Sequence, residues 1–409
     1  MADLADGERD LRGGTTLWEA QNGAADAARG LGGHARTDAC IIGAGITGAF
    51  LAEELSRRGL GVLVLDRRGP QRGSTAASTS LLQWELDLPL IALADRIGFE
   101  TAAAVWRRSR AAVQRIGALV GDLGASCDFA PRSTLYLAGD VLDPAGLREE
   151  RLARERAQLS SDLLDAAGLR LFAGIEAEAA LVSAGSAEAD PVALARLLMT
   201  AALRRGARLA APVTATEYAA TSRGVEIATD RGFEVSARVL IVASGYEMPG
   251  FVPAEHHRIV STWALASRPL PQDSLWPSRA LVWQASDPYL YLRTTPDGRI
   301  VAGGEDAELT DAAQRDAMTE AKVATIVEKL GGILPGRPIE PAYAWSGFFG
   351  ATDDSMPLIG PVPGMAHCFA AFGYGGNGIT FSAIAAEMLG RLVTGESDPQ
   401  AATFALDRG

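Results

Sequence analysis

Residues 38–66 carry the pattern that most constrains how this chain folds. A short apolar stretch, DACII (38–42), leads directly into a glycine-rich turn, GAGITG (43–48). Residues with helical spacing follow to about Arg58, and a second apolar stretch, GVLVLD (61–66), ends in an acidic residue. This order predicts a strand, a tight turn, a helix and a parallel second strand, which together form one βαβ unit of about 30 residues.

The chemistry of this unit is set by its glycines and its acid. Gly43, Gly45 and Gly48 allow a sharp turn, a close approach of the backbone to a pyrophosphate, and tight packing of helix on strand. The N-terminus of the helix then offers free N–H groups to the phosphates. Asp66 lies 18 residues after Gly48, where a carboxylate can bind the ribose hydroxyls of an adenosine. The unit predicts a dinucleotide site that disfavours NADP, but this half-site alone does not separate FAD from NAD.

Charge and composition exclude several classes of protein. The chain has 38 Lys and Arg residues against 50 Asp and Glu residues, so its net charge of −12 repels phosphate backbones and we expect no nucleic-acid partner. The three cysteines and four histidines show no ligand spacing, so we expect neither a disulfide framework nor a metal site. The N-terminus lacks the build of a secretory signal, and no apolar run approaches the ~18 to 20 residues of a membrane span. These features predict a cytoplasmic protein without a transmembrane segment.

Further segments follow the βαβ unit in a fixed order. They are GSTAASTS (73–80), LIVASG (240–245), WSG (345–347), MPLIG (356–360) and GYGGNGI (373–379). In this order the set resembles the D-amino-acid-oxidase-like superfamily of FAD-dependent oxidoreductases, to which glycine oxidase, sarcosine oxidase and γ-glutamylputrescine oxidoreductase belong. The resemblance extends over about residues 36 to 395.

The resemblance implies that the cofactor is FAD. The N-terminus of the last helix would face the N1/C2=O edge of the flavin, where negative charge develops on reduction. No cysteine lies between Trp345 and Gly360, where sarcosine-oxidase-like members attach their flavin, so we expect non-covalent FAD. Besides Gly43, Gly45, Gly48 and Asp66, the expected cofactor-binding residues are Ile46, Thr47, Arg67, Ser74, Thr75, Ser78, Val213, Gly245, Gly376, Asn377, Gly378 and Ile379.

The expected fold class is α/β, with a Rossmann-type FAD-binding domain and an interleaved antiparallel-sheet substrate domain. Helical patterns occupy 90–120 and 143–168, and short strand patterns separated by turn signals recur between 207 and 303. The expected division assigns 36–90, 191–250 and 345–400 to the FAD-binding domain, 91–190 and 251–344 to the substrate domain, and 1–35 to an N-terminal arm.

The resemblance further implies that FAD takes a hydride from a carbon that bears an amine, that water hydrolyses the resulting imine, and that O2 or another acceptor reoxidises the flavin. Glycine-oxidase-like members carry one arginine shortly after the WxG element and another in the last glycine-rich segment, where this chain has Phe349 and Gly376. Those arginines hold the substrate carboxylate in a bidentate fork. Their absence favours a small amine over an α-amino acid as the substrate.

The candidate residues of the substrate site are Arg293, Tyr291, Trp345 and Phe349. Arg293 is the best remaining anion binder, although an ordinary strand arginine in an ion pair explains it equally well. An apolar wall or a cation–π surface for an amine can come from Tyr291, Trp84, Trp345, Phe348 and Tyr374, although each of these can simply pack in the core.

Two other enzymatic interpretations stay open at this point. One is an FAD-dependent dehydrogenase or oxidase that acts on a 2-hydroxy acid. The other is an NAD-dependent dehydrogenase, in which the C-terminal glycine-rich segment has no cofactor role. A flavoprotein that acts on tRNA would need a basic face, which a net charge of −12 opposes.

Overall fold

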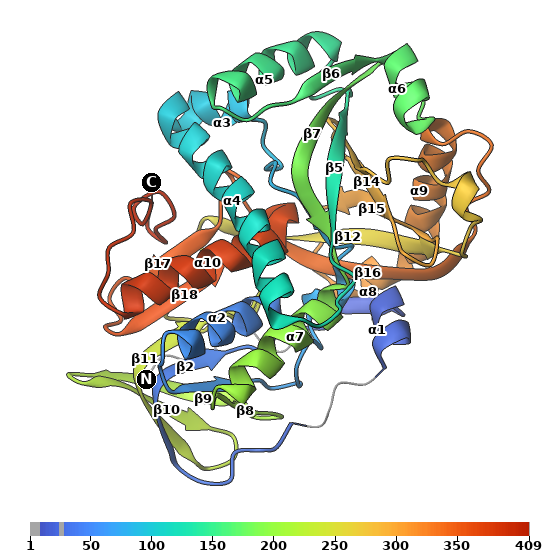
Figure 1. Ribbon diagram of the computed structural model, residues 1–409. Helices are drawn as coiled ribbons and strands as arrows, with labels where there is room; N and C mark the ends of the chain where they lie inside the picture. Colours follow the sequence, from blue (N-terminus) through green and yellow to red (C-terminus); the bar gives the residue numbers. More distant parts are fainter. Residues whose placement is uncertain (1–8, 24–27, 409) are drawn as a thin grey trace.

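The computed structural model describes residues 9–23 and 28–408, which form two β-sheets of eight and ten strands. In Figure 1 the eight-stranded sheet and its helices occupy the lower left, and the ten-stranded sheet rises to the upper right. The chain crosses between the two parts several times. The expected interleaved α/β fold is therefore confirmed.

The eight-stranded sheet grows from the predicted βαβ unit. Its main strands follow the order β17-β18-β11-β2-β3-β8, and β9 and β10 extend it beside β11. Ala39 and Ile41 of β2 pack into one core, under the helices, while Cys40 packs into the core on the other face. A strand that is buried on both faces has apolar residues at successive positions of its sequence, which explains the DACII pattern. The elements of this part are β2 (Ala35–Ile42), α2 (Ile46–Arg57), β3 (Val62–Leu65), α7 (Pro191–Arg204), β8 (Arg208–Ala210), β9 (Ala215–Thr221), β10 (Gly224–Thr229), β11 (Glu234–Val242), β17 (Leu358–Pro361), β18 (Cys368–Phe372) and α10 (Gly378–Val393).

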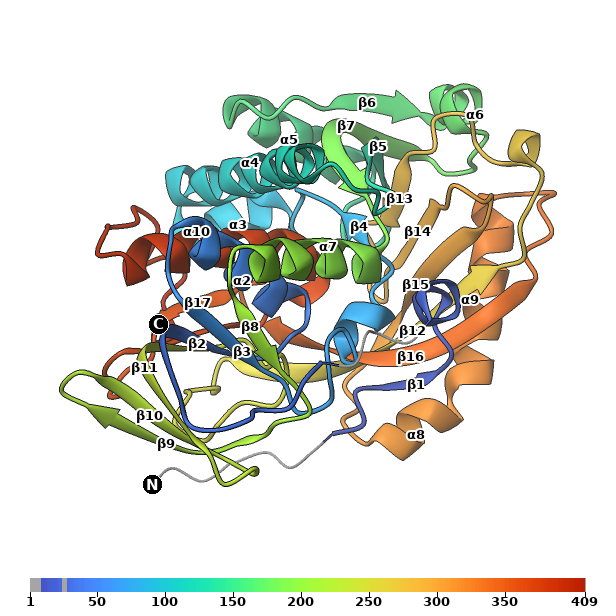
Figure 2. The same cartoon turned by 60° about the horizontal axis from the view of Figure 1, so that its bottom comes forward.

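The ten-stranded sheet follows the order β1-β16-β12-β15-β14-β13-β5-β7-β4, with β6 paired to β7. Its pairs are antiparallel as expected, except that β13 runs parallel to β5. Helices α3, α4 and α5 lie over one end of this sheet, and α8 and α9 lie at the other (Figures 1 and 2). The elements of this part are β4 (Leu81–Leu82), α3 (Leu90–Ile97), α4 (Phe99–Leu123), β5 (Ala130–Leu137), α5 (Pro144–Arg156), β6 (Asp162–Asp165), α6 (Ala166–Ala173), β7 (Ala179–Glu188), β12 (His257–Ser267), β13 (Leu281–Gln284), β14 (Leu290–Thr294), β15 (Ile300–Ala307), α8 (Ala312–Ala317), α9 (Thr319–Ile333) and β16 (Pro341–Thr352).

Two expectations differ from the observed elements. The helical pattern at 143–168 is interrupted, because Gln158 adopts a left-handed backbone conformation (φ 63°) and Asp165 caps a new helix by accepting a hydrogen bond from the Gly168 N–H. The expected domain boundary at residue 345 falls inside β16, which belongs entirely to the ten-stranded sheet.

The described part of the N-terminal arm packs on the body. Strand β1 (Arg12–Gly14) pairs with β16, and α1 (Leu17–Asn22) follows it (Figure 2). Trp18 is buried, and its Nε1–H donates to the carbonyl of Ser78 at 2.6 Å. Residues 1–8 and 24–27 of the expected arm lie outside the described residues.

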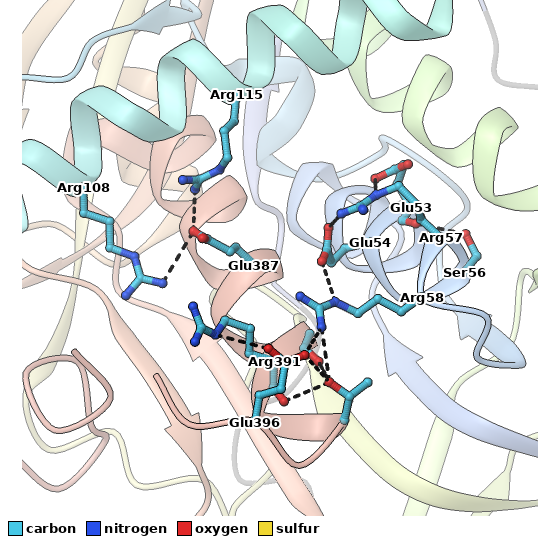
Figure 3. Close-up of polar contacts among 12 residues, drawn as sticks. Glu53, Glu54, Ser56, Arg57, Arg58, Arg108, Arg115, Glu387, Arg391 and Glu396 are labelled. Carbon is cyan, nitrogen blue, oxygen red and sulfur yellow. Dashed lines mark hydrogen bonds and ion pairs between the residues drawn. The ribbon is translucent and has the colours of Figure 1, made fainter. Parts of the chain in front are cut away.

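Charged side chains join helices from the two parts (Figure 3). Arg108 and Arg115 of α4 both reach Glu387 of α10, at 3.5 and 2.6 Å. Arg108 also donates to both carboxylate oxygens of Asp398, at 2.7 and 2.8 Å, and the Asp398 side chain is almost fully buried. This arginine therefore links α4 to the C-terminal segment that follows α10.

Replacing Arg108 with methionine should lower the free energy of unfolding by about 2 kcal/mol, because it leaves the buried Asp398 carboxylate without the cation that is hydrogen-bonded to both its oxygens. The control is Arg151→Met, which removes a half-buried arginine that pairs with the exposed Glu155 at 3.1 Å within α5. That variant should cost less than about 0.5 kcal/mol. Urea unfolding measures the loss of stability in both variants. Equal losses would contradict the stabilising role given to the pair of Arg108 and Asp398.

Candidate active site

Two adjoining cavities lie where the carboxyl ends of β2, β3 and β11 meet the ten-stranded sheet. They share five lining residues, Ile46, Thr47, Ser74, Thr75 and Gly245, so they form one elongated site. We call the part that Gly43, Gly45, Asp66 and Val213 line the nucleotide cavity. The other part, which we call the aromatic cavity, is lined at its far end by Trp283, Tyr289, Tyr291, Phe348, Phe349, Phe372 and Tyr374.

The glycine-rich turn is fixed by close contacts between backbone atoms. Gly43 has φ 110°, and a Cβ atom at this position would lie 2.4 Å from the carbonyl oxygen of Ala243 in the neighbouring segment. A Cβ at Gly48 would lie 1.9 Å from the carbonyl oxygen of Gly43. Gly48 therefore does not line the cavity but allows α2 to pack closely on the turn. The N–H of Ile46, at the start of α2, donates to Thr75 Oγ1 at 2.9 Å.

Acidic residues line the far end of the nucleotide cavity. Asp66 follows β3 and accepts hydrogen bonds from the N–H groups of Ala44, Arg68 and Gly69 at 2.7 to 2.8 Å. Glu247, for which no sequence pattern gives a signal, also lines this cavity. Burial alone would raise the pKa of Glu247, but hydrogen bonds from Arg68, the Arg9 N–H and Arg67 bring the pKa below its ordinary value.

The loop at 73–80 forms one wall of both cavities and is held from behind by three buried side chains. The Nε1–H groups of Trp18 and Trp345 donate to the carbonyls of Ser78 and Ala77, at 2.6 and 2.8 Å. Arg293 Nε donates to the carbonyl of Thr79 at 2.7 Å.

This arrangement corrects two expectations. Neither Trp345 nor Arg293 lines the aromatic cavity. The guanidinium of Arg293 also donates to the carbonyls of Thr294 and Ala189, at 3.1 and 2.9 Å, and lies 3.6 Å from Glu188. All its nitrogens are thus used inside the protein, and Arg293 is not placed to bind a substrate anion in the aromatic cavity.

The segment that opens α10 faces the aromatic cavity from the opposite side. Gly376, Gly378 and Ile379 line the cavity, whereas Asn377 turns away and donates through Nδ2 to the carbonyl of Glu85 at 2.7 Å. The Gly376 N–H, which we expected to face the flavin, donates to Asp87 Oδ2 at 2.7 Å. Asp87 also lines the cavity and gives no sequence signal, because its partner lies 289 positions away.

Most of the expected cofactor residues come together. Those that line one or both cavities are Gly43, Gly45, Ile46, Thr47, Asp66, Arg67, Ser74, Thr75, Ser78, Val213, Gly245, Gly376, Gly378 and Ile379. Of the expected substrate residues, Tyr291 and Phe349 line the aromatic cavity.

The shape of the site fits FAD. Gly245 and Gly378 both line the site, and a Cβ atom at either position would meet no atom within 4 Å. Their missing side chains therefore leave open space on two sides of the aromatic cavity. The N-terminus of α2 lies where the two cavities join, in place for a pyrophosphate, and that of α10 lines the aromatic cavity, in place for a flavin edge.

A Rossmann-type sheet with this elongated site defines the chain as a flavin-binding oxidoreductase. The comparison with known families agrees: the chain belongs to the FAD dependent oxidoreductase (DAO) family, whose model matches residues 38–392. It is therefore an FAD-dependent enzyme, and the match does not support the NAD-dependent alternative.

Individual relatives are distant. The chain is 25% identical to γ-glutamylputrescine oxidoreductase of Escherichia coli over 369 residues, which cover 88% of this chain and 84% of the relative. It is also 25% identical to the tRNA 5-methylaminomethyl-2-thiouridine biosynthesis bifunctional protein MnmC of Cupriavidus necator, over 89% of this chain but only 58% of that protein. The chain thus spans little more than half the length of this bifunctional relative.

Solved structures show the same fold. Glycine oxidase from Geobacillus kaustophilus superposes with a TM-score of 0.75 at 20% identity, over 92% of this chain and 99% of the other. L-Proline dehydrogenase from P. horikoshii superposes with a TM-score of 0.73 at 17% identity, over 92% and 98%. In the described part of the chain, the structure contains no helix with the length and apolar character of a membrane span.

Proposed function

We propose that this enzyme oxidises the C–N bond of a small amine and holds FAD without a covalent bond. The proposal rests on the kinds of charged side chain that line the aromatic cavity. None of the described residues that line it is an arginine, lysine or histidine. A site for an α-amino acid or a 2-hydroxy acid needs a cation for the carboxylate, whereas an amine does not.

Different residues would bind different parts of the cofactor along the site. Gly43, Gly45 and the first turn of α2 would hold the pyrophosphate, and the segment from Gly376 to Ile379 would face the ring. When bound, FAD supplies a two-electron acceptor for a hydride from the carbon next to the nitrogen. The substrate loses this hydride and one nitrogen proton, and its C–N bond becomes C=N. Water hydrolyses this imine to a carbonyl compound and ammonia, or an amine where the nitrogen is substituted, and the two electrons finally pass to O2 or another acceptor.

The aromatic side chains position the amine. Tyr291 and Phe349 line the cavity where the two sheets meet, and their rings exclude water from the reacting carbon. Burial raises the pKa of the Tyr291 hydroxyl far above its ordinary value, so this phenol stays neutral and is no general base. Hydride transfer requires only a neutral amine held at about 3 to 3.5 Å from its acceptor.

The cysteines support non-covalent binding. Cys40, Cys127 and Cys368 are buried, and burial raises the pKa of each thiol. None of them lines either described cavity, and neither does a histidine.

The test combines a spectrum with a substrate panel. Purified protein should be yellow, and FAD should separate from the chain after mild denaturation. Under anaerobic conditions, amines should bleach the flavin band faster than α-amino acids or 2-hydroxy acids do. Bleaching by hydroxy acids alone would overturn the proposal, and release of peroxide on re-aeration would identify O2 as the acceptor.

A further inference from the structure

The aromatic cavity contains a carboxyl group with no cation beside it. Asp87 is the only ionisable acid or base of the Asp, Glu, Lys, Arg and His types among the described residues that line it, and burial raises its pKa, which a cationic ligand would lower again. Its carboxylate accepts one hydrogen bond, from the Gly376 N–H, and forms no ion pair with any described residue. A carboxylate in such a place usually pairs with a cation, because the loss of water around an unpaired charge is costly.

A second carboxylate lies behind the same wall. Asp306 of β15 interacts with the hydroxyls of Thr262 and Tyr289, both of which line the cavity. Burial raises the pKa of Asp306 to about 7, although these two hydroxyls lower it, and the charge of Asp87 adds to the rise. Asp306 Oδ1 is buried without a hydrogen-bond partner, and Asp306 too forms no ion pair with the described residues.

Unpartnered polar atoms accompany these acids. Ser80 is 2% exposed and Trp283 is 5% exposed, and both line the cavity. Ser80 Oγ and Trp283 Nε1 are buried, and neither has a hydrogen-bond partner among the described residues. Because buried polar groups in proteins are almost always hydrogen-bonded, these atoms point to a polar ligand in the cavity.

Aromatic rings complete the surroundings of a cation. Trp283 is held rigidly, since it stacks on Tyr136 with ring centroids 3.8 Å apart and an interplanar angle of 16°. Tyr291 lies opposite Trp283 in the pairing of β13 with β14, and the ring centroids of Tyr289 and Tyr291 are 5.5 Å apart. The charges of both acids act on both tyrosines. Aromatic faces attract ammonium groups, and most strongly where water is excluded.

We propose that the substrate carries a second, cationic group remote from the C–N bond that is oxidised, and that Asp87, supported by Asp306, binds this group. A linear diamine has this chemistry: one nitrogen is neutral at the reacting carbon, and the other is an ammonium at the acidic end. A substrate carboxylate at the same position would be repelled by the carboxylate of Asp87, because none of the described residues that line the cavity supplies a cation to separate the two. This inference rests on the proposed function and narrows it from amines to diamine-like substrates.

The test measures the binding of three probes to the FAD-loaded protein. 1,4-Diaminobutane, butylamine and 2-aminopentanoate are titrated, and the perturbation of the flavin spectrum gives each Kd. The wild type should bind the diamine at least about tenfold more tightly than butylamine, as expected for one charge-assisted hydrogen bond, and should bind 2-aminopentanoate most weakly.

The Asp87→Asn variant should lower the preference for the diamine by about tenfold, because the amide keeps an acceptor for the Gly376 N–H but loses the charge. Asp306→Asn should lower the preference for the diamine by less, because Thr262 and Tyr289 separate this acid from the cavity. The control is Asp273→Asn, an exposed acid outside the cavity, which should leave the preference unchanged.

Two outcomes would overturn this inference while the proposed function stands. One is a diamine Kd no lower than that of butylamine, and the other is a diamine preference that survives in Asp87→Asn. Tightest binding of 2-aminopentanoate together with its anaerobic oxidation, or bleaching by hydroxy acids alone, would instead reject the proposed function itself.

Discussion

Replacing Gly378 with leucine should give a folded protein that does not retain FAD. Gly378 has right-handed helical dihedral angles (φ −51°, ψ −40°), so a leucine causes no backbone strain. A Cβ atom there meets nothing within 4 Å, and the side chain would extend into the aromatic cavity. Overfilling a close-packed site by a side chain of this size costs about 3 kcal/mol, so we expect FAD affinity to fall about a hundredfold.

The matched control is the same substitution at Gly331. This glycine lies in α9, is exposed, and also leaves open space where a Cβ would stand, but it lies outside both cavities. Circular dichroism should show both variants folded, while the FAD-to-protein absorbance ratio falls only for Gly378→Leu. A Gly378→Leu variant that stays as yellow as the wild type would place the flavin elsewhere.

Replacing Arg293 with methionine should cause a loss of stability of about 3 to 5 kcal/mol. Three buried carbonyls, those of Thr79, Ala189 and Thr294, would lose their donor. Glu188, itself buried, would lose its interaction with Arg293 and keep the one with Arg132 at 2.7 Å. Losses of this size are typical when one partner of a buried, hydrogen-bonded charge is removed.

The readout separates this structural role from a role in substrate binding. The urea midpoint should fall sharply, whereas KM for an amine should change little at temperatures where the variant is folded. Arg293→Lys keeps the charge and should lose less stability, so it serves if the methionine variant does not fold. Arg238→Met, which removes an arginine that is 75% exposed, should cost less than about 0.5 kcal/mol. A raised KM with an unchanged midpoint would restore Arg293 to the substrate site.

The nucleotide half of the site could be predicted because its constraints lie close together in sequence. The turn at 43–48, the helix and Asp66 form one continuous unit, and Gly43 and Gly48 are needed for backbone contacts that any side chain would block. The cofactor segments near Gly245 and Gly378 could be placed from their resemblance to a family, since each follows a buried strand in a fixed order.

The substrate half could not be predicted in the same way, because its residues come from many strands. Tyr291 and Arg293 share a face of β14 by their spacing, yet only Tyr291 reaches the cavity. Thr79, from a loop more than 200 positions earlier, interacts with both side chains and lies at the edge of the site. No local sequence pattern predicts contacts between residues so far apart in the chain. The contact of Asp87 with Gly376 could not be predicted for the same reason.

A crystal structure of the protein with FAD bound tests the central claim most directly. We expect one FAD molecule with its pyrophosphate at Gly43–Gly48, its adenosine beside Asp66 and Val213, and its ring between the start of α10 and the aromatic side chains. A ring bound away from Gly376–Ile379, or FAD density outside the two cavities, would contradict the account.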